Sequence, residues 1–247
     1  MNDAGYWRDK YEQCQRTLER HDLLPLPPAH LRVRIGGWDD PDHFLGVGRK
    51  IYWDLKRVLG GIGRTRESFE SILDFGCGCA RTLRFFPRRD GLHGCDIDPE
   101  AIAWCREHLG ERASFQVNSP EPPLPYADGA FDFVYAISVF THLPEDMQLR
   151  WWEELARVVR PGGIVLASAH GEQLLDGTEE QARQLREHGF LYAVGGGTDG
   201  LPSFYQTSFH TPDYVKANWT KHFELVHSLP RGINNHQDAY LLQAKPA

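Results

Sequence analysis

The feature that most constrains the fold is the stretch SILDFGCGCAR at residues 71–81. The apolar run 71–75 is too short for a helix and stops at a glycine, which predicts a buried parallel strand. Gly76 and Gly78 then allow a sharp turn and bring the backbone close to a ligand, where a Cβ atom would collide. A helix is expected over residues 81–86. A strand, a glycine turn and a helix start together predict a nucleotide site at the end of the strand.

A second strand, expected over residues 92–98, places an acid about 20 residues after the glycine turn. The carboxylate of Asp96 suits the hydroxyls of a ribose. A nicotinamide-dependent oxidoreductase fits less well, because the G-x-G-x-x-G spacing that starts at Gly76 needs a glycine where Arg81 stands. Ala80 can serve as the third small residue one step earlier.

Four segments in the same order resemble the class I S-adenosylmethionine-dependent methyltransferases. They are residues 73–78, 94–99, 124–132 and 157–163, and the similarity covers about residues 70–169. The resemblance implies an α/β, Rossmann-like fold with a seven-stranded sheet. This sheet is mostly parallel with an antiparallel last strand, and helices cover both faces. The implied cofactor is S-adenosyl-L-methionine and the implied partner is a small-molecule substrate.

The resemblance also implies which residues hold the cofactor. Asp74 and the two glycines surround the methionine part, Asp96 holds the ribose and Ile97 packs against adenine. Asn118 stands where many members of the family carry an acid, and its amide oxygen can still accept a hydrogen bond from adenine. The full set of expected cofactor residues is Asp74, Gly76, Cys77, Gly78, Asp96, Ile97, Asn118, Ser119 and Ser138.

The composition limits which kinds of partner and which cellular location are expected for the protein. A net charge of −7 and a pI near 5.9 disfavour nucleic acid as the main partner. No apolar run is long enough to span a membrane and no leader is visible, so no membrane partner and a cytoplasmic location are expected. Cys77, Cys79 and Cys95 lie near His93, but their C-x-C spacing is not that of a zinc site, so no metal is expected. The sequence leaves the oligomeric state open.

The chain divides into an N-terminal helical cap over residues 1–66 and a Rossmann-like methyltransferase domain over residues 67–247. The apolar stripe of Trp7, Tyr11, Cys14 and Leu18 predicts a first helix in the cap. Asp40 has the chemistry of a helix start for a second one. Within the domain, residues 189–211 are expected to form a loop region near the substrate. Arg32 and Arg34 are candidates to meet the cofactor carboxylate.

The remaining elements follow from periodicity and from proline and glycine breaks. Strands are expected at 113–117, 131–137, 164–169, 223–229 and 239–243, and helices at 99–109, 144–159, 179–188 and 212–222. The last two strands should form a hairpin. Aromatic walls for an acceptor are offered by Tyr126, Phe140, Trp151, Tyr192, Phe204, Tyr205 and Trp219.

Methyl transfer from a sulfonium requires mainly alignment and exclusion of water, but a hydroxyl acceptor also needs a base. His142 follows the fourth strand at the expected edge of the pocket and is the candidate general base. His170, His210 and His236, with Asp238, are the alternatives. Methylation of a hydroxyl is expected. N-methylation of a small amine and a cofactor-binding protein without catalysis remain open.

Overall fold

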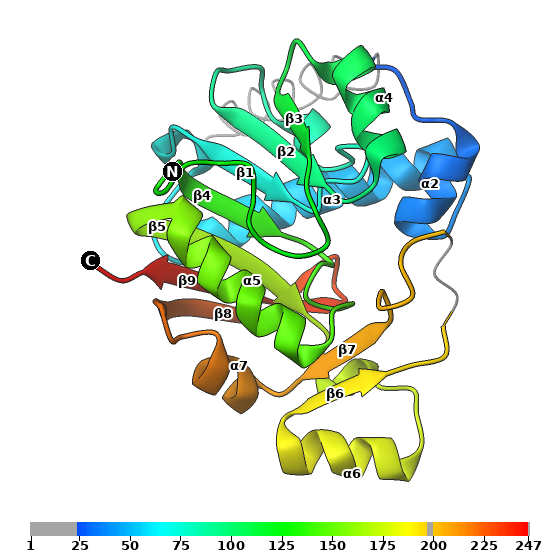
Figure 1. Cartoon of the computed structure of the whole chain (residues 1–247), viewed down its shortest axis with the longest axis vertical. Coiled ribbons are helices and arrows are strands. Elements are labelled where there is room, and N and C mark those ends of the chain that lie inside the picture. Colours follow the sequence, from blue (N-terminus) through cyan, green and yellow to red (C-terminus); the bar gives the residue numbers. More distant parts are fainter. Residues whose placement is uncertain (1–23, 197–199, 247) are drawn as a thin grey trace, which may run out of the picture.

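A seven-stranded sheet in the order β3-β2-β1-β4-β5-β9-β8 forms the centre of the molecule (Figure 1). The computed structural model describes residues 24–196 and 200–246, so the helix expected around Trp7 to Leu18 lies outside the described residues. The strands are β1 Ile72–Phe75, β2 Leu92–Asp96, β3 Ser114–Val117, β4 Phe131–Ala136, β5 Val159–Ala169, β6 Phe190–Ala193, β7 Thr207–His210, β8 Phe223–Ile233 and β9 Gln237–Ala244. The α-helices are α2 Ala29–Gly36, α3 Pro41–Gly60, α4 Pro99–Leu109, α5 Glu145–Val158, α6 Glu179–His188 and α7 Pro212–Asn218, with 3-10 turns η1 Arg66–Ser68, η2 Leu83–Phe85 and η3 Glu172–Leu174.

The prediction of a seven-stranded sheet is confirmed, both in the number of strands and in their directions. β1 pairs in parallel with β2 on one side and with β4 on the other. β9 runs antiparallel to both β5 and β8, as expected for a final hairpin. Because β1 to β4 are parallel, their carboxyl ends meet at one edge of the sheet, where open α/β sheets bind their ligands.

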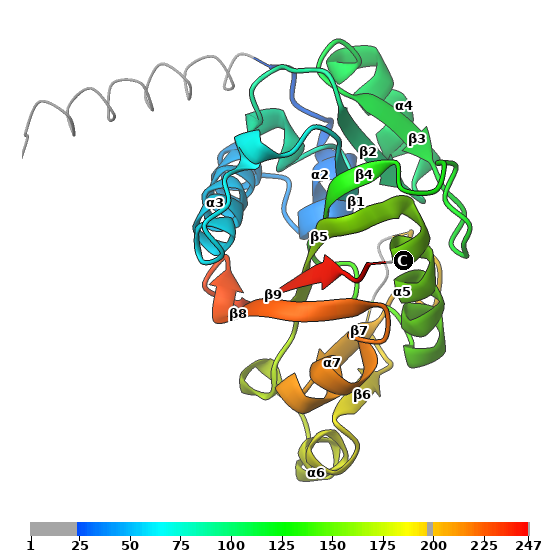
Figure 2. The same ribbon diagram turned by 90° about the vertical axis from the view of Figure 1, so that its left-hand side faces the viewer.

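Helices cover both faces of the sheet, and α3 and α5 lie on opposite sides in Figure 2. The alternation of side chains in β1 explains the two layers, since Ile72 belongs to one hydrophobic core and Leu73 to the other. The first core joins α3 and α4 to the sheet. The second joins α5 and α7, with Trp151 and Trp152 of α5 buried in it.

The described part of the N-terminal extension, residues 24–66, packs on the Rossmann-like domain through α3. Buried Arg84 donates hydrogen bonds to the carbonyls of Leu24 and Pro25, which ties the start of the described chain to η2. α3 begins as predicted at Asp40, whose side chain accepts a hydrogen bond from the backbone N–H of Asp42. A domain boundary near residue 66 stays a prediction.

Two local predictions were wrong. The helix expected over residues 81–86 is only the 3-10 turn η2, which follows a turn that contains Ala80 at a positive φ of 55°. The stretch 189–211, expected as loop, contains β6 and β7, which pair as a separate two-stranded sheet. In the part of the chain that the structure describes, no helix has the length and apolar character needed to cross a bilayer.

Candidate functional site

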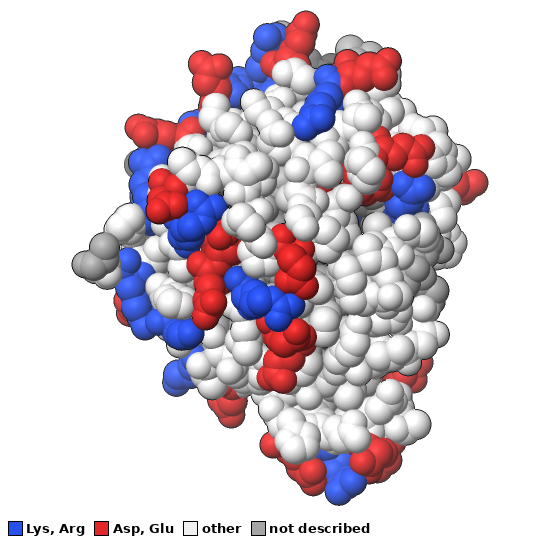
Figure 3. Space-filling view, viewed as in Figure 1, with Lys and Arg blue, Asp and Glu red and all other residues white. Residues whose placement is uncertain are grey.

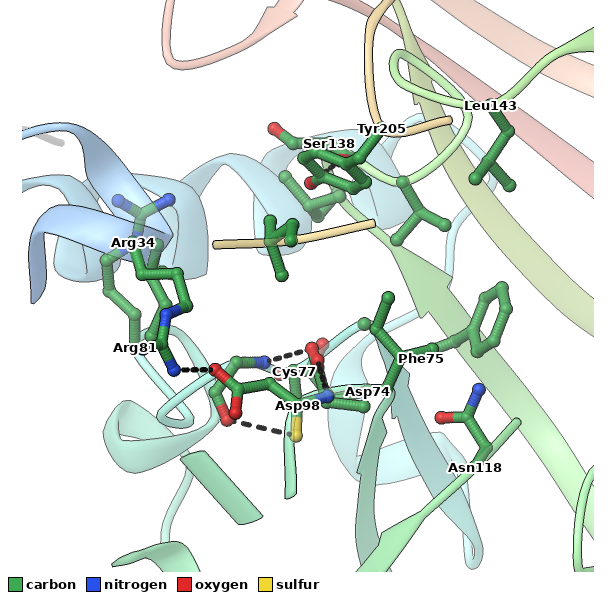
Figure 4. A pocket seen from close by; sticks show the side chains of 18 of the residues that line it. Arg34, Asp74, Phe75, Cys77, Arg81, Asp98, Asn118, Ser138, Leu143 and Tyr205 are labelled. Atoms are coloured by element: carbon green, nitrogen blue, oxygen red, sulfur yellow. Dashed lines mark hydrogen bonds and ion pairs between the residues drawn. The ribbon is translucent and has the colours of Figure 1, made fainter. Parts of the chain in front are cut away.

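A cavity opens at the carboxyl ends of β1, β2 and β4 (Figure 4). Its empty volume is about 1040 Å³, including the solvent at its mouth. It is lined from the cofactor side by Asp74, Gly76, Cys77, Gly78, Asp96, Ile97, Asn118 and Ser138, so eight of the nine residues expected to hold the cofactor share one cavity. Ser119 is the exception and does not line it.

The two glycines of the turn have conformations that other residues avoid. Gly76 has a φ of +77°, and a Cβ there would lie 2.4 Å from a methyl carbon of Val139. Gly78 has a φ of +51°, and its Cβ would lie 3.0 Å from Ile35 of α2. The absence of side chains at these two glycines therefore leaves space between the turn and its neighbours Val139 and Ile35.

Asp96 is held in place by the backbone. One carboxylate oxygen accepts a hydrogen bond from the N–H of Gly78 at 2.7 Å, and the other accepts from the N–H of Asp98 at 2.9 Å. Burial raises the pKa of Asp96, while these N–H groups lower it. A carboxylate oxygen can accept more than one hydrogen bond, and Asp96 lines the cavity, which suits the hydroxyls of a ribose. Capping of α4 belongs to Asp98, whose side chain accepts from Glu100 and Ala101.

Asp74 is buried at the end of β1, opposite Tyr135 of β4. Burial raises the pKa of Asp74 to about 8; the Tyr135 hydroxyl lowers it, Asp96 raises it further by a smaller amount, and Arg81 lowers it least. A buried carboxyl group at a cavity wall is expected to attract a ligand group of positive charge.

Asn118, which replaces the acid of the family pattern, has an unsatisfied acceptor at the cavity. Its side-chain N–H₂ donates to the carbonyl of Ser119 at 2.8 Å, whereas its amide oxygen is buried without a hydrogen-bond partner among the described residues. An amino group such as that of adenine fits this oxygen. Ser119 has a different role, because its hydroxyl accepts from the N–H of Glu121.

Ser138 follows β4 with a φ of 59°, a conformation that few residues other than glycine adopt. Three contacts hold it there. Its N–H donates to the Ser168 hydroxyl at 2.8 Å, its own hydroxyl bonds to the amide of Gln237, and its carbonyl accepts from the hydroxyl of Tyr205 at 3.3 Å. Strained backbone of this kind is concentrated at functional sites.

The opposite wall of the cavity is apolar and comes from two distant segments. Val139 and Leu143 follow β4, and Leu201, Phe204 and Tyr205 precede β7. Of the seven aromatic residues suggested from the sequence, Trp151, Phe204 and Tyr205 line the cavity, whereas Tyr126, Phe140, Tyr192 and Trp219 do not.

Hydrogen bonds join the two segments. The Gln206 N–H donates to the His142 carbonyl at 3.1 Å, and the Ser208 N–H donates to the Thr141 carbonyl at 2.7 Å. The Gln206 side-chain oxygen accepts from the N–H groups of Gly195 and Gly196, which ties the wall to the end of β6. The area over β6 and β7 shows almost no charged side chains in Figure 3, in contrast to α5 and α6.

His142 lies behind this wall rather than on the cavity surface. Its ring stacks on the Tyr205 ring with centroids 4.2 Å apart, and its Nδ1 lies 2.6 Å from the Gln206 carbonyl oxygen. A carbonyl only accepts, so Nδ1 carries the proton and Nε2 carries the lone pair. Burial lowers the pKa of His142, which keeps the ring neutral at neutral pH.

The alternative histidines have partners outside the cavity. His170 approaches Gln237 through Nε2 at 3.3 Å, and His210 is bonded through Nε2 to the Gln148 side-chain oxygen at 2.9 Å. His236 packs its ring against His170. Asp238 accepts from the N–H of Arg231 and the side chain of Gln173. None of these four residues lines the cavity.

The two arginines considered for the cofactor carboxylate have other partners. Arg34 lines the cavity but is paired with Asp98 at 2.7 Å and Glu100 at 3.0 Å. Arg32 donates to the backbone carbonyls of Asp39 and Pro27. Within residues 24–196 and 200–246, no three His, Cys, Asp or Glu side chains are grouped so that they could hold a metal ion.

Sequence reasoning missed several cavity residues. The sequence pattern draws attention to Arg81 only because a dinucleotide motif would need a glycine there, whereas the structure places Arg81 on the cavity wall next to the turn. Leu201 gave no signal, because an apolar residue in a loop is ordinary in sequence terms. Only the folding of residues 200–206 against the end of β4 brings it to the site.

Comparison with known proteins finds a methyltransferase domain within the chain. Residues 72–163 match the family model described as "Methyltransferase domain". The chain is 30% identical over 141 residues to the methyltransferase GfsG of Streptomyces halstedii, which is 53% of this chain and 48% of that protein. It is 26% identical over 230 residues to 27-O-demethylrifamycin SV methyltransferase of Amycolatopsis mediterranei, covering 83% of this chain and 78% of the relative. It is also 25% identical over 167 residues to norajmaline N-methyltransferase of Rauvolfia serpentina, covering 62% of this chain and 56% of that enzyme.

The fold is shared with solved structures. A SAM-dependent methyltransferase from Methanosarcina mazei matches with a TM-score of 0.53 and 22% identity, over 72% of this chain and 94% of that one. The putative methyltransferase complexed with the Trm112 activator of Haloferax volcanii has a TM-score of 0.56 at 16% identity, over 90% of this chain and all of the other.

The strand order, the glycine turn and the acid at the end of β2 define an α/β protein that binds a nucleoside cofactor at the carboxyl edge of its sheet. Together with the match of residues 72–163 to the methyltransferase domain and with the relatives, they support a class I S-adenosylmethionine-dependent methyltransferase whose cofactor is S-adenosyl-L-methionine. The chain spans about half the length of GfsG, so the acceptor and the whole reaction belong to the proposal below.

Proposed function

We propose that the protein transfers a methyl group from S-adenosyl-L-methionine to a hydroxyl of an uncharged small molecule. The observation that carries this proposal is the composition of the cavity. Its cofactor side has the unsatisfied amide oxygen of Asn118 and the carboxylate of Asp96, and its other side is the apolar wall of Val139, Leu201 and Phe204. Such a wall gives an apolar acceptor a place beside the cofactor.

The residues of the cavity fit the cofactor part by part. Asn118 accepts from the adenine amino group, Asp96 accepts from the ribose hydroxyls, and the turn at Gly76 and Gly78 leaves room for the amino-acid part. When bound, S-adenosylmethionine supplies a methyl group on a positively charged sulfur. The protein contributes mainly alignment and exclusion of water.

The choice of a hydroxyl rests on the charge of the acceptor wall and on His142. An ammonium ion buried at the site would need a carboxylate, and the wall formed by Val139, Leu143, Leu201, Phe204 and Tyr205 has none. His142 has its proton fixed on Nδ1, so Nε2 can accept the proton of a hydroxyl. We propose His142 as the general base, which requires the acceptor to displace Tyr205 from its stacked position.

The relatives include both classes of acceptor, since one is named as an O-methyltransferase of Aspergillus nomiae and another as an N-methyltransferase. N-methylation of a neutral amine is therefore the second candidate. It needs no base, because a neutral amine already has a lone pair for attack.

The test is a screen of hydroxyl and amine acceptors with cofactor labelled in the methyl group. Label in an ether product supports the proposal, and label confined to N-methyl products refutes the O-specific part. Tight binding of S-adenosylhomocysteine without turnover of any acceptor would instead support the alternative of a cofactor-binding protein without catalysis.

A further inference from the structure

The side chain of Tyr205 fills the place that an acceptor has to take. Tyr205 lines the cavity together with Ser138 and lies beside it in Figure 4. Its ring stacks on the ring of His142, with centroids 4.2 Å apart and an angle of 17° between the planes. Because His142 is the proposed base, an acceptor that reaches this base occupies the volume of the Tyr205 ring.

Two weak contacts hold the Tyr205 side chain in this place. One is the stack on His142, and the other is the hydrogen bond that its hydroxyl donates to the Ser138 carbonyl at 3.3 Å. This distance is longer than the usual range for a bond between two oxygens. The backbone is held separately, because the Tyr205 N–H donates to the Pro202 carbonyl at 2.9 Å and Gln206 is bonded to His142. A ligand can therefore replace the Tyr205 side chain without separating the two segments of the wall.

The space that the Tyr205 side chain occupies is flat and apolar. Its shape is that of one phenol ring, and the planar imidazole of His142 forms one side of it. Aromatic rings make favourable stacked and edge contacts with each other, so this side favours a planar ring over a puckered one. The rest of the acceptor wall is apolar and consists of Val139, Leu143, Leu201 and Phe204.

The hydroxyl of Tyr205 lies within electrostatic reach of the cofactor side of the cavity. Burial raises the pKa of Tyr205 most, Asp96 raises it further, and Arg81 lowers it. Asp96 and Arg81 line the cavity at the end of β2 and next to the glycine turn. A phenol in the place of Tyr205 therefore has room for its oxygen on the side where the cofactor binds.

The weakness of the proposed base favours the same class of acceptor. Burial lowers the pKa of His142 more than its hydrogen bond to Gln206 raises it, so the ring takes up a proton less readily than free imidazole. A phenol ionises with a pKa of about 10, whereas the hydroxyl of water has a pKa of about 15.7 and is closer to that of an aliphatic alcohol. Proton transfer is more efficient when the two pKa values are closer, so a weak base suits a phenol better.

We propose that the acceptor is a phenol, or a larger molecule that presents a phenolic ring, and that this ring replaces the Tyr205 side chain next to His142. This inference rests on the proposed function and names the class of its acceptor. In the transfer, the phenol oxygen forms a bond to the methyl carbon and the bond from that carbon to sulfur breaks. The phenolic proton passes to Nε2 of His142, and S-adenosylhomocysteine is left as the second product.

The probe is p-cresol, which is the tyrosine side chain as a free molecule. Calorimetry measures its binding to protein saturated with S-adenosylhomocysteine, and 4-methylcyclohexanol is the matched probe with a puckered ring. Tyr205→Ala vacates the space, so it should bind p-cresol about 10- to 100-fold more tightly than wild type does, the effect of one aromatic contact and one hydrogen bond. It should also prefer p-cresol to 4-methylcyclohexanol by about tenfold or more. Tyr192→Ala is the matched control, because Tyr192 does not line the cavity, and should stay within about threefold of wild type.

Turnover gives a second measurement. With cofactor labelled in the methyl group, wild type should form aryl methyl ethers from phenols, and Tyr205→Ala should lower KM for p-cresol by the same factor as its dissociation constant. Tyr205→Phe retains the ring and loses only the hydrogen bond to Ser138, so its KM should fall by less than about tenfold.

The outcomes separate this inference from the proposed function. Equal affinity of wild type and Tyr205→Ala for p-cresol would overturn the inference. Faster methylation of 4-methylcyclohexanol than of p-cresol by wild type, a comparison that needs no variant, would overturn the phenol class and leave hydroxyl methylation standing. Methylation of p-toluidine, the amine of the same shape, without methylation of any hydroxyl would instead refute the hydroxyl part of the proposed function.

Discussion

At the cofactor end of the cavity the polar groups come from strand ends and from the turns that follow them, whereas the acceptor wall is assembled from segments about 60 residues apart. Gly78 and Asp96 are joined by one hydrogen bond between the ends of neighbouring strands. On the acceptor side, Gln206 is joined to His142 by two hydrogen bonds across a separation of 64 residues. The sheet itself positions the first set, and the second depends on the packing of the β6–β7 region.

The difference implies different sensitivities. A change at the cofactor end should alter cofactor affinity, because the sheet keeps the rest of the site in place. A change at the acceptor wall should alter turnover or acceptor binding and leave cofactor affinity intact. Each prediction below tests whether the two ends of the cavity are separable in this way.

The largest effect is expected for His142→Asn. Asparagine retains a side chain of similar polarity but not the basicity of an imidazole, so turnover of a hydroxyl acceptor should fall by about 10²–10⁴-fold with cofactor affinity unchanged. Because burial lowers the pKa of His142, wild-type activity should be lost only as the pH falls through a value below the usual one near 6.5. A pH–rate profile at saturating cofactor measures both. His236→Asn is the control, and near-normal turnover of the His142→Asn variant would limit His142 to holding the wall.

The second prediction concerns the stability of the fold at low pH. We expect the buried histidines behind the acceptor wall to lower the free energy of unfolding as the pH decreases. Burial lowers the pKa of His210 to about 3 and that of His170 to about 4. His210 already uses Nε2–H to bond Gln148, and Nδ1 has no partner among the described residues, so a second proton would be buried unpaired.

The sign follows from proton binding. Between about pH 6.5 and pH 3 the unfolded chain binds more protons at His210 than the folded protein, so the free energy of unfolding falls as the pH decreases. His210 should contribute a loss of about 3 kcal/mol between pH 7 and pH 4. Urea unfolding at several pH values measures it. His210→Gln should flatten the pH dependence, and the exposed His188→Gln should not; parallel curves for wild type and His210→Gln would contradict the assignment.

Asp96→Ala tests the cofactor end. Loss of hydrogen bonds from a charged carboxylate to the ribose should weaken binding of S-adenosylhomocysteine by about 1–3 kcal/mol. Because Asp96 also accepts from the N–H groups of Gly78 and Asp98, Asp96→Asn is the companion variant, which retains one acceptor oxygen. Calorimetry gives both affinities. An unchanged affinity in the Asp96→Ala variant would remove the ribose contact from Asp96.

The same contrast explains how far the sequence predicts the molecule. The strand over residues 71–75, the glycine turn and Asp96 are local patterns, and the structure brings them together because parallel strands end at one edge. Ser119 is expected at the site because it follows Asn118 after the third strand, but only Asn118 lines the cavity. Leu201 and Phe204 reach the cavity through tertiary hydrogen bonds that no local pattern encodes.

A smaller effect is expected for Phe204→Ala in the acceptor wall. Removing this ring takes apolar contact from the acceptor, and a pocket contact of that kind contributes about 1–3 kcal/mol, so KM for the acceptor should rise about tenfold or more. The affinity for S-adenosylhomocysteine should change by less than about twofold. Steady-state kinetics gives KM for the acceptor, and calorimetry on the same preparation gives the affinity for S-adenosylhomocysteine. Tyr192→Phe is the control, since Tyr192 reaches the wall only through a hydrogen bond to the Phe204 carbonyl.

The smallest expected effect is the release of a proton from Asp74 when the cofactor binds. Burial raises the pKa of Asp74 to about 8, so most of the free protein has a protonated Asp74 at pH 7. A ligand that brings an ammonium or a sulfonium to this carboxyl stabilises its charged form, lowers the pKa and releases the proton. Binding of S-adenosylmethionine at pH 7 should therefore release somewhat less than one proton, and the release should vanish above about pH 9, where Asp74 is already ionised.

Calorimetric titrations in buffers of different ionisation enthalpy measure the number of protons released. Asp74→Asn should abolish the release, whereas Asp98→Asn should retain it. Equal proton release in wild type and the Asp74→Asn variant would assign the proton to another group and would leave Asp74 without a charged partner in the bound cofactor.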